Sequence, residues 1–296
     1  MNEILLKALY VKVKEALGEE YSVDIRSKFD NNNCERIVFV MRKGDDLVLP
    51  AIGADSMVSD LENDLNRMVF NIVSLVHKRG INPINERSLE DFGNVKELLR
   101  VKLINYEANR PLLKDIPHVK FLDLAIVFYL FLGADDSDII SSLVTNQHME
   151  LWKVNGEQLY EFALSNMKEK MPPILLTMED VLEPSNSTED SSENESDMYV
   201  LTIKNGTLGA AAILYSSELE KMADAFNCDI AILPSSIHEL ILVKGTERGE
   251  LAELNVNVQQ INNHVVKKED RLSNSVYLYD RNKKEIRIAV QGEALR

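Results

Sequence analysis

A serine pair followed by a histidine and a glutamate stands between two apolar runs in the stretch 232–243, ILPSSIHELILV. The hydroxyls of Ser235 and Ser236 are of the type that acts as a nucleophile, and His238 beside Glu239 can serve as a base, so the stretch contains candidate catalytic residues of a hydrolase. The same side chains can bind a partner or a small polar ligand. In a third, structural interpretation, which we favour, the serine hydroxyls only bond the backbone of their own turn between two strands.

Two well-defined catalytic motifs do not fit this stretch. A zinc peptidase helix of the HExxH type needs a second histidine four residues after His238, and Leu242 stands there. A nucleophile elbow requires small residues on both sides of the serine, but Pro234 and Ile237 flank the pair. The sequence therefore supplies candidates without a complete catalytic signature.

A second histidine, His118, follows a proline just ahead of the longest apolar run. We expect it to be a polar edge residue and include it among the candidate binding residues. A metal site built from His118, Asp123 and His238 would need further ligands that the sequence does not supply. No metal site and no cofactor is predicted.

Composition narrows the class of protein. The chain of 296 residues has 33 basic and 48 acidic residues and a net charge of -15, which opposes direct binding to nucleic acid and suits a protein partner with a basic surface. Cys34 and Cys228 stand far apart and outside any metal-binding spacing, which favours a reducing cytoplasm. The apolar run 124–134 is shorter than the roughly 20 residues of a membrane span, so it is interpreted as a buried strand.

The first part of the chain alternates between strand and helix patterns. A helix over 3–17 precedes three strand-like segments joined by turns, which predict an antiparallel meander. Helical spacing then covers 56–78 and a second segment that starts at Ser88 and runs to Leu103. Further along, the predicted elements are the buried strand, another strand and two helices, at 121–132, 138–144, 146–152 and 156–171.

The acidic stretch 184–197, PSNSTEDSSENESD, has no large apolar residue and is interpreted as a flexible linker. The residues after it predict the order ββαββαββ, with Asn205-Gly206 as a hairpin turn between strands at 198–203 and 210–214. We therefore expect an α+β protein of two domains, 1–172 and 198–296, with antiparallel sheets that carry helices on one face.

Seven short motifs resemble an uncharacterised bacterial family, a domain of unknown function. They extend from about residue 95 to the end of the chain, and the first 90 residues match poorly. The resemblance implies a fold and a setting among bacterial accessory or mobile-element genes, and no activity. The motifs are Lys102–Asn109, Ile116–His118, Phe121–Tyr129, Met198–Thr202, Gly209–Tyr215, Leu233–Glu239 and Leu272–Tyr277.

These observations predict a cytoplasmic protein-interaction module without enzymatic activity, which binds another protein near 232–243 or in a groove between the domains. A hydrolase that uses His238 and Glu239 with one of the two serines is an alternative. A further alternative is an acidic inhibitor that occupies the basic nucleic-acid-binding site of another protein.

Overall fold

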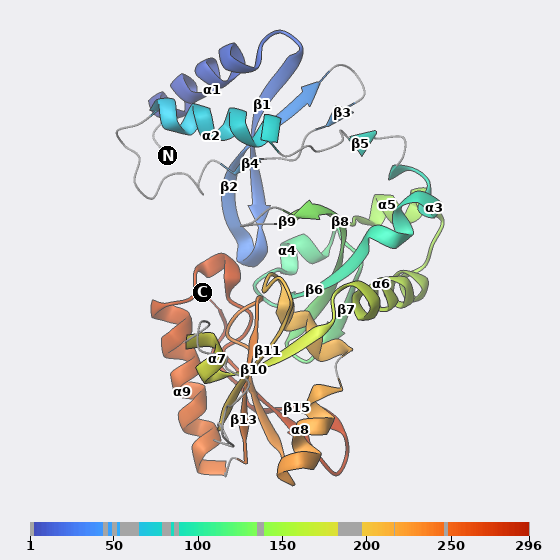
Figure 1. Cartoon of the computed structure of the whole chain (residues 1–296), viewed down its shortest axis with the longest axis vertical. Helices are drawn as coiled ribbons and strands as arrows, with labels where there is room; N and C mark the ends of the chain where they lie inside the picture. Colours follow the sequence, from blue (N-terminus) through green and yellow to red (C-terminus); the bar gives the residue numbers. More distant parts are fainter. Residues whose placement is uncertain are drawn as a thin grey trace.

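The computed structural model describes residues 3–43, 47–48, 52–53, 65–78, 84–85, 89–134, 139–182, 197–215, 217–245 and 248–295. The described elements form three antiparallel sheets that follow one another along the long axis of the molecule (Figure 1). The mixed α+β class with antiparallel sheets is thereby confirmed. The predicted linker lies almost entirely outside the described residues.

The N-terminal elements form a sheet with two helices on one face. Helices α1 (Glu3–Leu17) and α2 (Leu65–Lys78) bury Leu9, Val13, Met68 and Ile72 against the sheet, because their apolar residues recur at helical spacing. The predicted meander and first helix are confirmed, whereas 56–64 of the second predicted helix lie outside the described residues. The strands are β1 (Tyr21–Asp30), β2 (Cys34–Lys43), β3 (Leu47–Val48), β4 (Ile52–Gly53) and β5 (Ile84–Asn85), with the 3-10 turn η1 (Asn31–Asn33) between β1 and β2.

The middle sheet is built around β8 (Leu124–Ala134), whose residues 124–130 are all buried. It pairs with β6 on one side and with β7 and β9 on the other, as the run of apolar residues on both alternations predicts for a central strand. The other elements here are α3 (Phe92–Val95), η4 (Lys96–Leu98), β6 (Leu99–Asn105), α4 (Arg110–Leu113), β7 (His118–Phe121), β9 (Ile139–Leu143), α5 (Asn146–Trp152) and α6 (Gly156–Lys170).

The C-terminal sheet has the strand order β10-β11-β13-β12-β14-β15, and every pair is antiparallel. Its first strand, β10, precedes the acidic stretch in sequence and pairs with β11 after it. The elements are β10 (Pro173–Thr177), α7 (Met178–Leu182), β11 (Met198–Ile203), η5 (Gly209–Leu214), α8 (Glu218–Phe226), β12 (Ile230–Leu233), β13 (Leu240–Lys244), α9 (Arg248–His264), η6 (Lys268–Asp270), β14 (Val276–Asp280) and β15 (Glu285–Val290).

The helix predicted from Ser88 to Leu103 is wrong over most of its length. Only 92–95 are α-helical, with Asp91 as the N-cap, and Leu99–Asn105 form strand β6. Leu99 and Leu103 lie on the predicted helical face, but with Val101 they also form an apolar spacing of two, and pairing with β8 selects the strand. Ser88 itself lies outside the described residues.

The strand predicted at 210–214 is also wrong, because this segment is the 3-10 helix η5. Gly206 has a positive φ of 68° and turns the chain as expected, but no second strand follows. A Cβ on Gly209 would stand 2.2 Å from the Thr202 hydroxyl and 2.5 Å from the carbonyl oxygen of His238. The glycine therefore allows the chain to pass directly over β11, and a paired strand does not fit in this position.

Helices cover both faces of the C-terminal sheet, which corrects the expectation of helices on one face. Ala231 and Leu233 of β12 pack on α9, whereas Ile230 and Ile232 face the cluster that contains α8 and η5. β12 is buried at every position, as a strand between two layers must be. The cluster on the α8 side takes residues from both sides of the predicted linker, and the described structure does not show a division into two domains.

Candidate functional site

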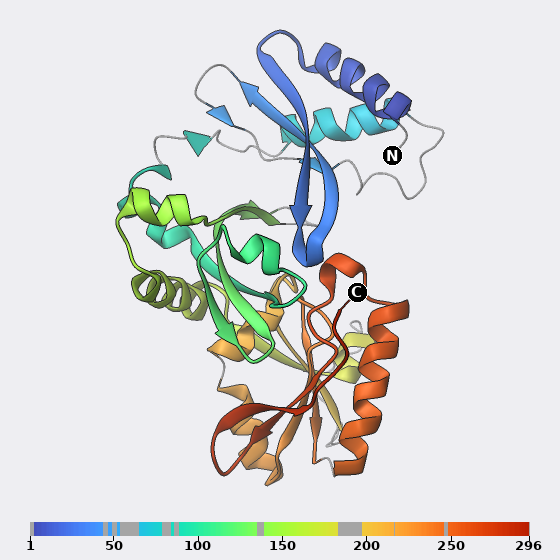
Figure 2. The ribbon, with the colours of Figure 1, turned by 180° about the vertical axis from the view of Figure 1, so that it is seen from behind.

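A cavity of about 900 Å³ lies where the three sheets meet. The tip of the β1–β2 hairpin reaches from the first sheet to the segment before β14 (Figure 2). Residues of these two parts line the cavity together with one face of the middle sheet. The remaining wall comes from the loops that hold Thr207 and Ile237. No single element forms this cavity, so it exists only when the three parts are assembled.

The floor of the cavity is one face of the middle sheet. Alternate residues of β6, β8 and β9 point to it, because successive side chains of a strand face opposite sides. Apolar side chains make up most of this floor, and the polar exceptions are an ammonium, a phenol and a hydroxyl. The floor residues are Lys102, Ile104, Val127, Tyr129, Ile139, Ser141 and Leu143.

A network of asparagine side chains fixes the hairpin tip over the floor. The Asn109 side-chain oxygen accepts the backbone N–H of Asn32 at 2.8 Å, and its amide nitrogen lies 3.0 Å from the Asn31 oxygen. Asn31 and Asn32 in turn donate to the carbonyls of Glu269 and Lys268, at 2.6 and 2.8 Å. The sequence presented these asparagines only as a turn, whereas their buried amides join the hairpin to two distant segments.

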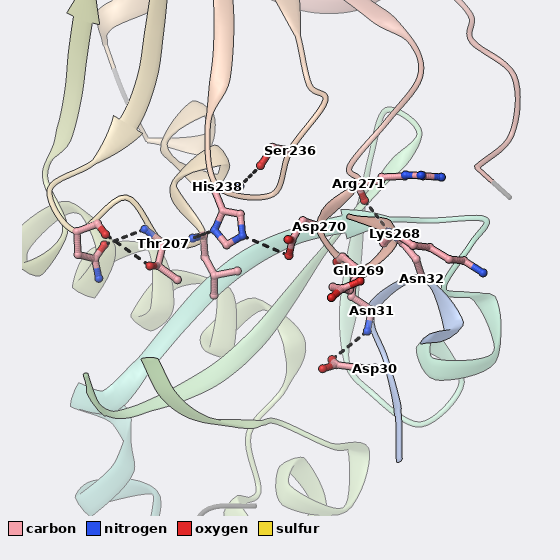
Figure 3. Close-up of polar contacts among 12 residues, drawn as sticks. Asp30, Asn31, Asn32, Thr207, Ser236, His238, Lys268, Glu269, Asp270 and Arg271 are labelled. Atoms are coloured by element: carbon pink, nitrogen blue, oxygen red, sulfur yellow. Dashed lines mark hydrogen bonds and ion pairs between the residues drawn. The ribbon is translucent and has the colours of Figure 1, made fainter. Parts of the chain in front are cut away.

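His238 lies in the wall of the cavity and is held at both ring nitrogens. Its Nδ1 accepts the backbone N–H of Leu208 at 3.3 Å, and its Nε2 lies 3.3 Å from the Asp270 carboxylate (Figure 3). An accepting Nδ1 places the ring hydrogen of a neutral histidine on Nε2, facing Asp270. The partner of His238 is therefore Asp270, which the sequence did not single out.

The two serines of the same turn are buried and engaged with the backbone. Ser236 Oγ accepts the N–H of His238 at 3.0 Å, and the Ser235 carbonyl accepts the N–H of Leu272 at 3.0 Å. Their relative exposures are 6% for Ser235 and 5% for Ser236, so neither hydroxyl faces open solvent. The Ser236 hydroxyl thus bonds its own turn, as the structural interpretation expects, and no hydrogen bond joins either serine to Glu239 within the described residues.

His118 and Asp123 are not among the residues that line the cavity. The His118 ring nitrogen Nδ1 is 3.1 Å from the carbonyl oxygen of Ile116, as expected for a polar edge residue. Asp123 accepts hydrogen bonds from Ser273, Ser275 and Tyr277, which come from the C-terminal part of the chain. Within the described residues no group of three His, Cys, Asp and Glu side chains is placed to hold a metal ion.

Lys102 is the charged residue of the cavity floor. Burial lowers the pKa of its ammonium group, and the charge of Asp30 opposes only part of that effect. Asp30 shows the counterpart: burial opposes its ionisation, but Lys102 and the Asn31 N–H together hold the pKa of Asp30 below its ordinary value. No ion pair or hydrogen bond of the Lys102 ammonium group occurs within the described residues.

The acids that line the cavity already have partners. Arg36 lies 3.1 Å from Glu269 and 3.8 Å from Asp30. The Asp270 carboxylate lies 3.3 Å from Nε2 of His238. Glu35 accepts the hydroxyl of Ser27 at 2.5 Å. In contrast, the described residues supply no ion pair to the cavity lysines, which are Lys28, Lys102 and Lys267. The lining has four basic side chains and four acidic ones, so its formal charge is balanced, although three of the basic groups have no ion pair within the described residues.

Tyr129 adds a hydrogen-bond donor to the same floor. Its side chain is only 2% exposed, and burial raises the pKa of its hydroxyl far above the usual value, so the phenol stays neutral. No hydrogen bond of this hydroxyl is found in the part of the chain that the structure describes. Lys102 and Tyr129 are the residues that sequence reasoning missed, and both lie within motifs that carry the family resemblance.

The family model of DUF5688, a family of unknown function, matches residues 3–281. The chain belongs to DUF5688. The match begins at residue 3, so the resemblance read from motifs over 95–296 was too short, and the first sheet is part of DUF5688 as well. No curated protein and no solved structure matches this DUF5688 chain. None of its described helices has the length and apolar content to cross a membrane.

Replacement of Lys102 by methionine is expected to stabilise the fold. The change keeps the length of the side chain and removes a half-buried charge without a partner, which is expected to raise the free energy of unfolding by about 1 kcal/mol. Urea unfolding at pH 7 measures this difference. Lys120→Met is the matched control, because Lys120 is exposed over the ring of Tyr106 outside the cavity and its replacement removes no buried charge.

The gain from Lys102→Met is expected to shrink as the pH rises. The pKa of Lys102 is lower in the folded chain than its value of 10.5 in the unfolded chain. At pH values between the two, the unfolded chain binds more protons than the folded chain, so the free energy of unfolding of wild type rises with pH. The methionine variant lacks this titration. A variant less stable than wild type at pH 7, or a gap that widens toward pH 10.5, contradicts the description of Lys102 as an unpaired, desolvated cation.

Proposed function

We propose that this DUF5688 protein binds a small anionic molecule in the cavity, with Lys102 and the exposed Lys28 and Lys267 as its basic contacts. The observation that carries the proposal is the half-buried ammonium group of Lys102, which has no ion pair within the described residues. A desolvated charge that forms no ion pair costs stability, and an anionic ligand supplies a direct partner. Stability given up at one position is typical of functional residues.

The size and lining of the cavity support the same proposal. Small-molecule sites measure roughly 300–1,000 Å³ and combine apolar walls with a few polar groups. Here the apolar floor positions the body of a ligand, and the hydroxyls of Tyr129, Ser141 and Thr207 can fix its orientation. Lys28 and Lys267 stand exposed among the lining residues, where they favour the approach of an anion.

The binding experiment compares an anion with its neutral counterpart. Titration calorimetry of the full chain uses succinate, inorganic phosphate and glucose 6-phosphate as anionic probes, and succinamide and glucose as matched neutral ones. Binding of at least one anionic probe is expected, weaker at high salt, together with a loss of about tenfold or more in affinity in Lys102→Met. Lys120→Met is expected to bind like wild type.

Either of two results overturns the proposal. One is equal binding of the anionic and neutral probes, and the other is unchanged anion affinity in the Lys102→Met variant. Binding of none of the anionic probes also counts against it, because their carboxylates and phosphates represent the two common anionic groups of small ligands.

The functions expected from the sequence stay predictions. The partner-binding module was expected near 232–243, whose Ile237 and His238 also line the cavity, but no described contact favours a protein as the occupant, and the same holds for the acidic inhibitor. The hydrolase hypothesis gains no support, since Ser236 Oγ bonds its own turn and His238 faces Asp270.

A further inference from the structure

The surroundings of Lys102 combine an apolar wall with a single nearby carboxylate. Val127 lies directly opposite Lys102 on β8, and Ile104 and Leu143 line the same cavity. Asp30, at the hairpin tip, is the acid whose charge acts on the ammonium group, without forming an ion pair with it. A lysine in such surroundings has a larger neutral amine fraction near pH 7 than a lysine in water.

We propose that Lys102 is a nucleophile that forms an imine with the carbonyl group of an anionic aldehyde or 2-oxo acid bound in the cavity. The inference rests on the proposed binding function, because the anionic group of the ligand must be held while its carbonyl carbon meets the amine. Desolvated lysines among apolar side chains are the type of amine that performs this chemistry.

The step is a condensation and needs no oxidant or reductant. The lone pair of the Lys102 nitrogen forms a bond to the carbonyl carbon, and the carbonyl oxygen leaves as water with two protons from the nitrogen. The ammonium group first loses a proton to water, and the charge of the ionised Asp30 then stabilises a protonated imine. The neutral hydroxyl of Tyr129 is available in the same floor to donate to the carbonyl oxygen.

The anionic group at the other end of the ligand can pair with the exposed lysines of the cavity lining. The exposed Lys28 and Lys267 line the cavity together with Lys102, so a carboxylate or phosphate can pair with them while the carbonyl group is directed to the floor. The inferred substrate class is therefore a short molecule with an anionic group at one end and a carbonyl at the other.

Reductive trapping tests this inference. The full chain is incubated with glyoxylate and sodium cyanoborohydride, which reduces an imine to a stable secondary amine, and each lysine is then quantified by peptide mass spectrometry. Lys102 is expected to react faster than the exposed Lys120, because the lowered pKa of Lys102 leaves a larger fraction of its amine neutral. An excess of the anion that binds best in calorimetry is expected to protect Lys102 and leave Lys120 unaffected.

Lys102→Arg is the second variant, because it keeps the positive charge and removes the nucleophile. It is expected to retain anion binding and to lose the adduct at position 102, with no other lysine gaining reactivity. Circular dichroism checks that the Lys102→Arg variant is folded. If the variant does not fold, the ratio of the labelling rates of Lys102 and Lys120 in wild type still tests the inference.

The outcomes separate the two proposals. Equal labelling of Lys102 and Lys120, with anion binding intact in calorimetry, overturns the imine and leaves the binding function standing. Preferential labelling of Lys102 that no anion suppresses overturns the binding function. Selective, anion-protected labelling that disappears in Lys102→Arg supports both.

Discussion

Replacement of Asp123 by alanine is expected to destabilise the protein by about 4 kcal/mol, a large part of the total stability of an ordinary domain. The Asp123 carboxylate accepts the hydroxyls of Ser273, Ser275 and Tyr277 at 2.7, 2.9 and 2.5 Å. These three donors are buried, so alanine leaves three hydroxyls without their acceptor. Urea unfolding followed by circular dichroism measures the loss.

The charge of Asp123 also affects Tyr277. Burial, and after it the negative charge of Asp123, raise the pKa of Tyr277 well above its ordinary value, so this phenol donates its hydrogen throughout the accessible pH range. Asp123→Asn keeps an acceptor oxygen without the charge and is expected to lose less than the alanine variant. Asp115→Ala, at an exposed site in the same part of the chain, is expected to change stability by about 0.5 kcal/mol or less. Equal losses of stability in the Asp115→Ala and Asp123→Ala variants would contradict the conclusion that the Asp123 carboxylate stabilises the contact with Ser273, Ser275 and Tyr277.

Replacement of Asn109 by alanine is expected to release the hairpin tip. The change removes the acceptor of the Asn32 N–H and the amide contacts to Asn31, Asn32 and the Asn105 carbonyl, all within 3.1 Å. The expected cost is about 3 kcal/mol of local stability, which corresponds to on the order of a hundredfold faster hydrogen exchange. Hydrogen–deuterium exchange of peptides from the tip measures the effect directly.

This release should also affect the cavity, because the hairpin tip forms one of its walls. Anion binding in the Asn109→Ala variant is therefore expected to weaken, while exchange in α9 stays as in wild type. Asn94→Ala is the matched control, since Asn94 is exposed in α3 and far from the tip in sequence. Hydrogen exchange that rises evenly over the whole chain would mean that Asn109 contributes to global stability, and not to the local attachment of the hairpin tip.

Much of the local structure could be predicted from single residues and their spacing. The apolar run of β8 predicted a buried central strand, and its residues 124–130 are buried on both faces. The helical spacing of α1 and α6 and the strand alternation around β14 and β15 were likewise confirmed. These elements are predictable because their patterns fit one type of structure only.

Prediction failed where two local patterns were both satisfied. Leu99 and Leu103 fit the predicted helix, and together with Val101 they fit a strand; the hydrogen bonds with β8 along the whole of β6 select the strand. The error hid Lys102, since a lysine on the exposed side of a predicted helix attracts no attention. On strand β6 the same lysine alternates away from Val101 and Leu103 and faces the cavity.

The candidate site was predictable only in fragments. His238 was singled out from the sequence, and the structure places it in the cavity wall, but its partner Asp270 is thirty-odd residues away and comes from η6. The asparagines at the hairpin tip showed a turn and nothing more. In the folded protein the side chains of Asn31 and Asn32 are buried, so each of their polar groups needs a hydrogen-bond partner. Asn109 supplies such partners and thereby fixes the hairpin tip.

By itself the sequence determined the acidic character of the protein, the antiparallel α+β class and the membership of a family whose motifs it carries. Only the tertiary structure decided which side chains meet. Asp30, Lys102 and Asp270 lie far apart in the chain and line one cavity, because the hairpin tip, β6 and η6 are brought together by packing between sheets. Spacing along a chain reports periodicity within an element, and contacts between distant elements depend on how their buried faces fit.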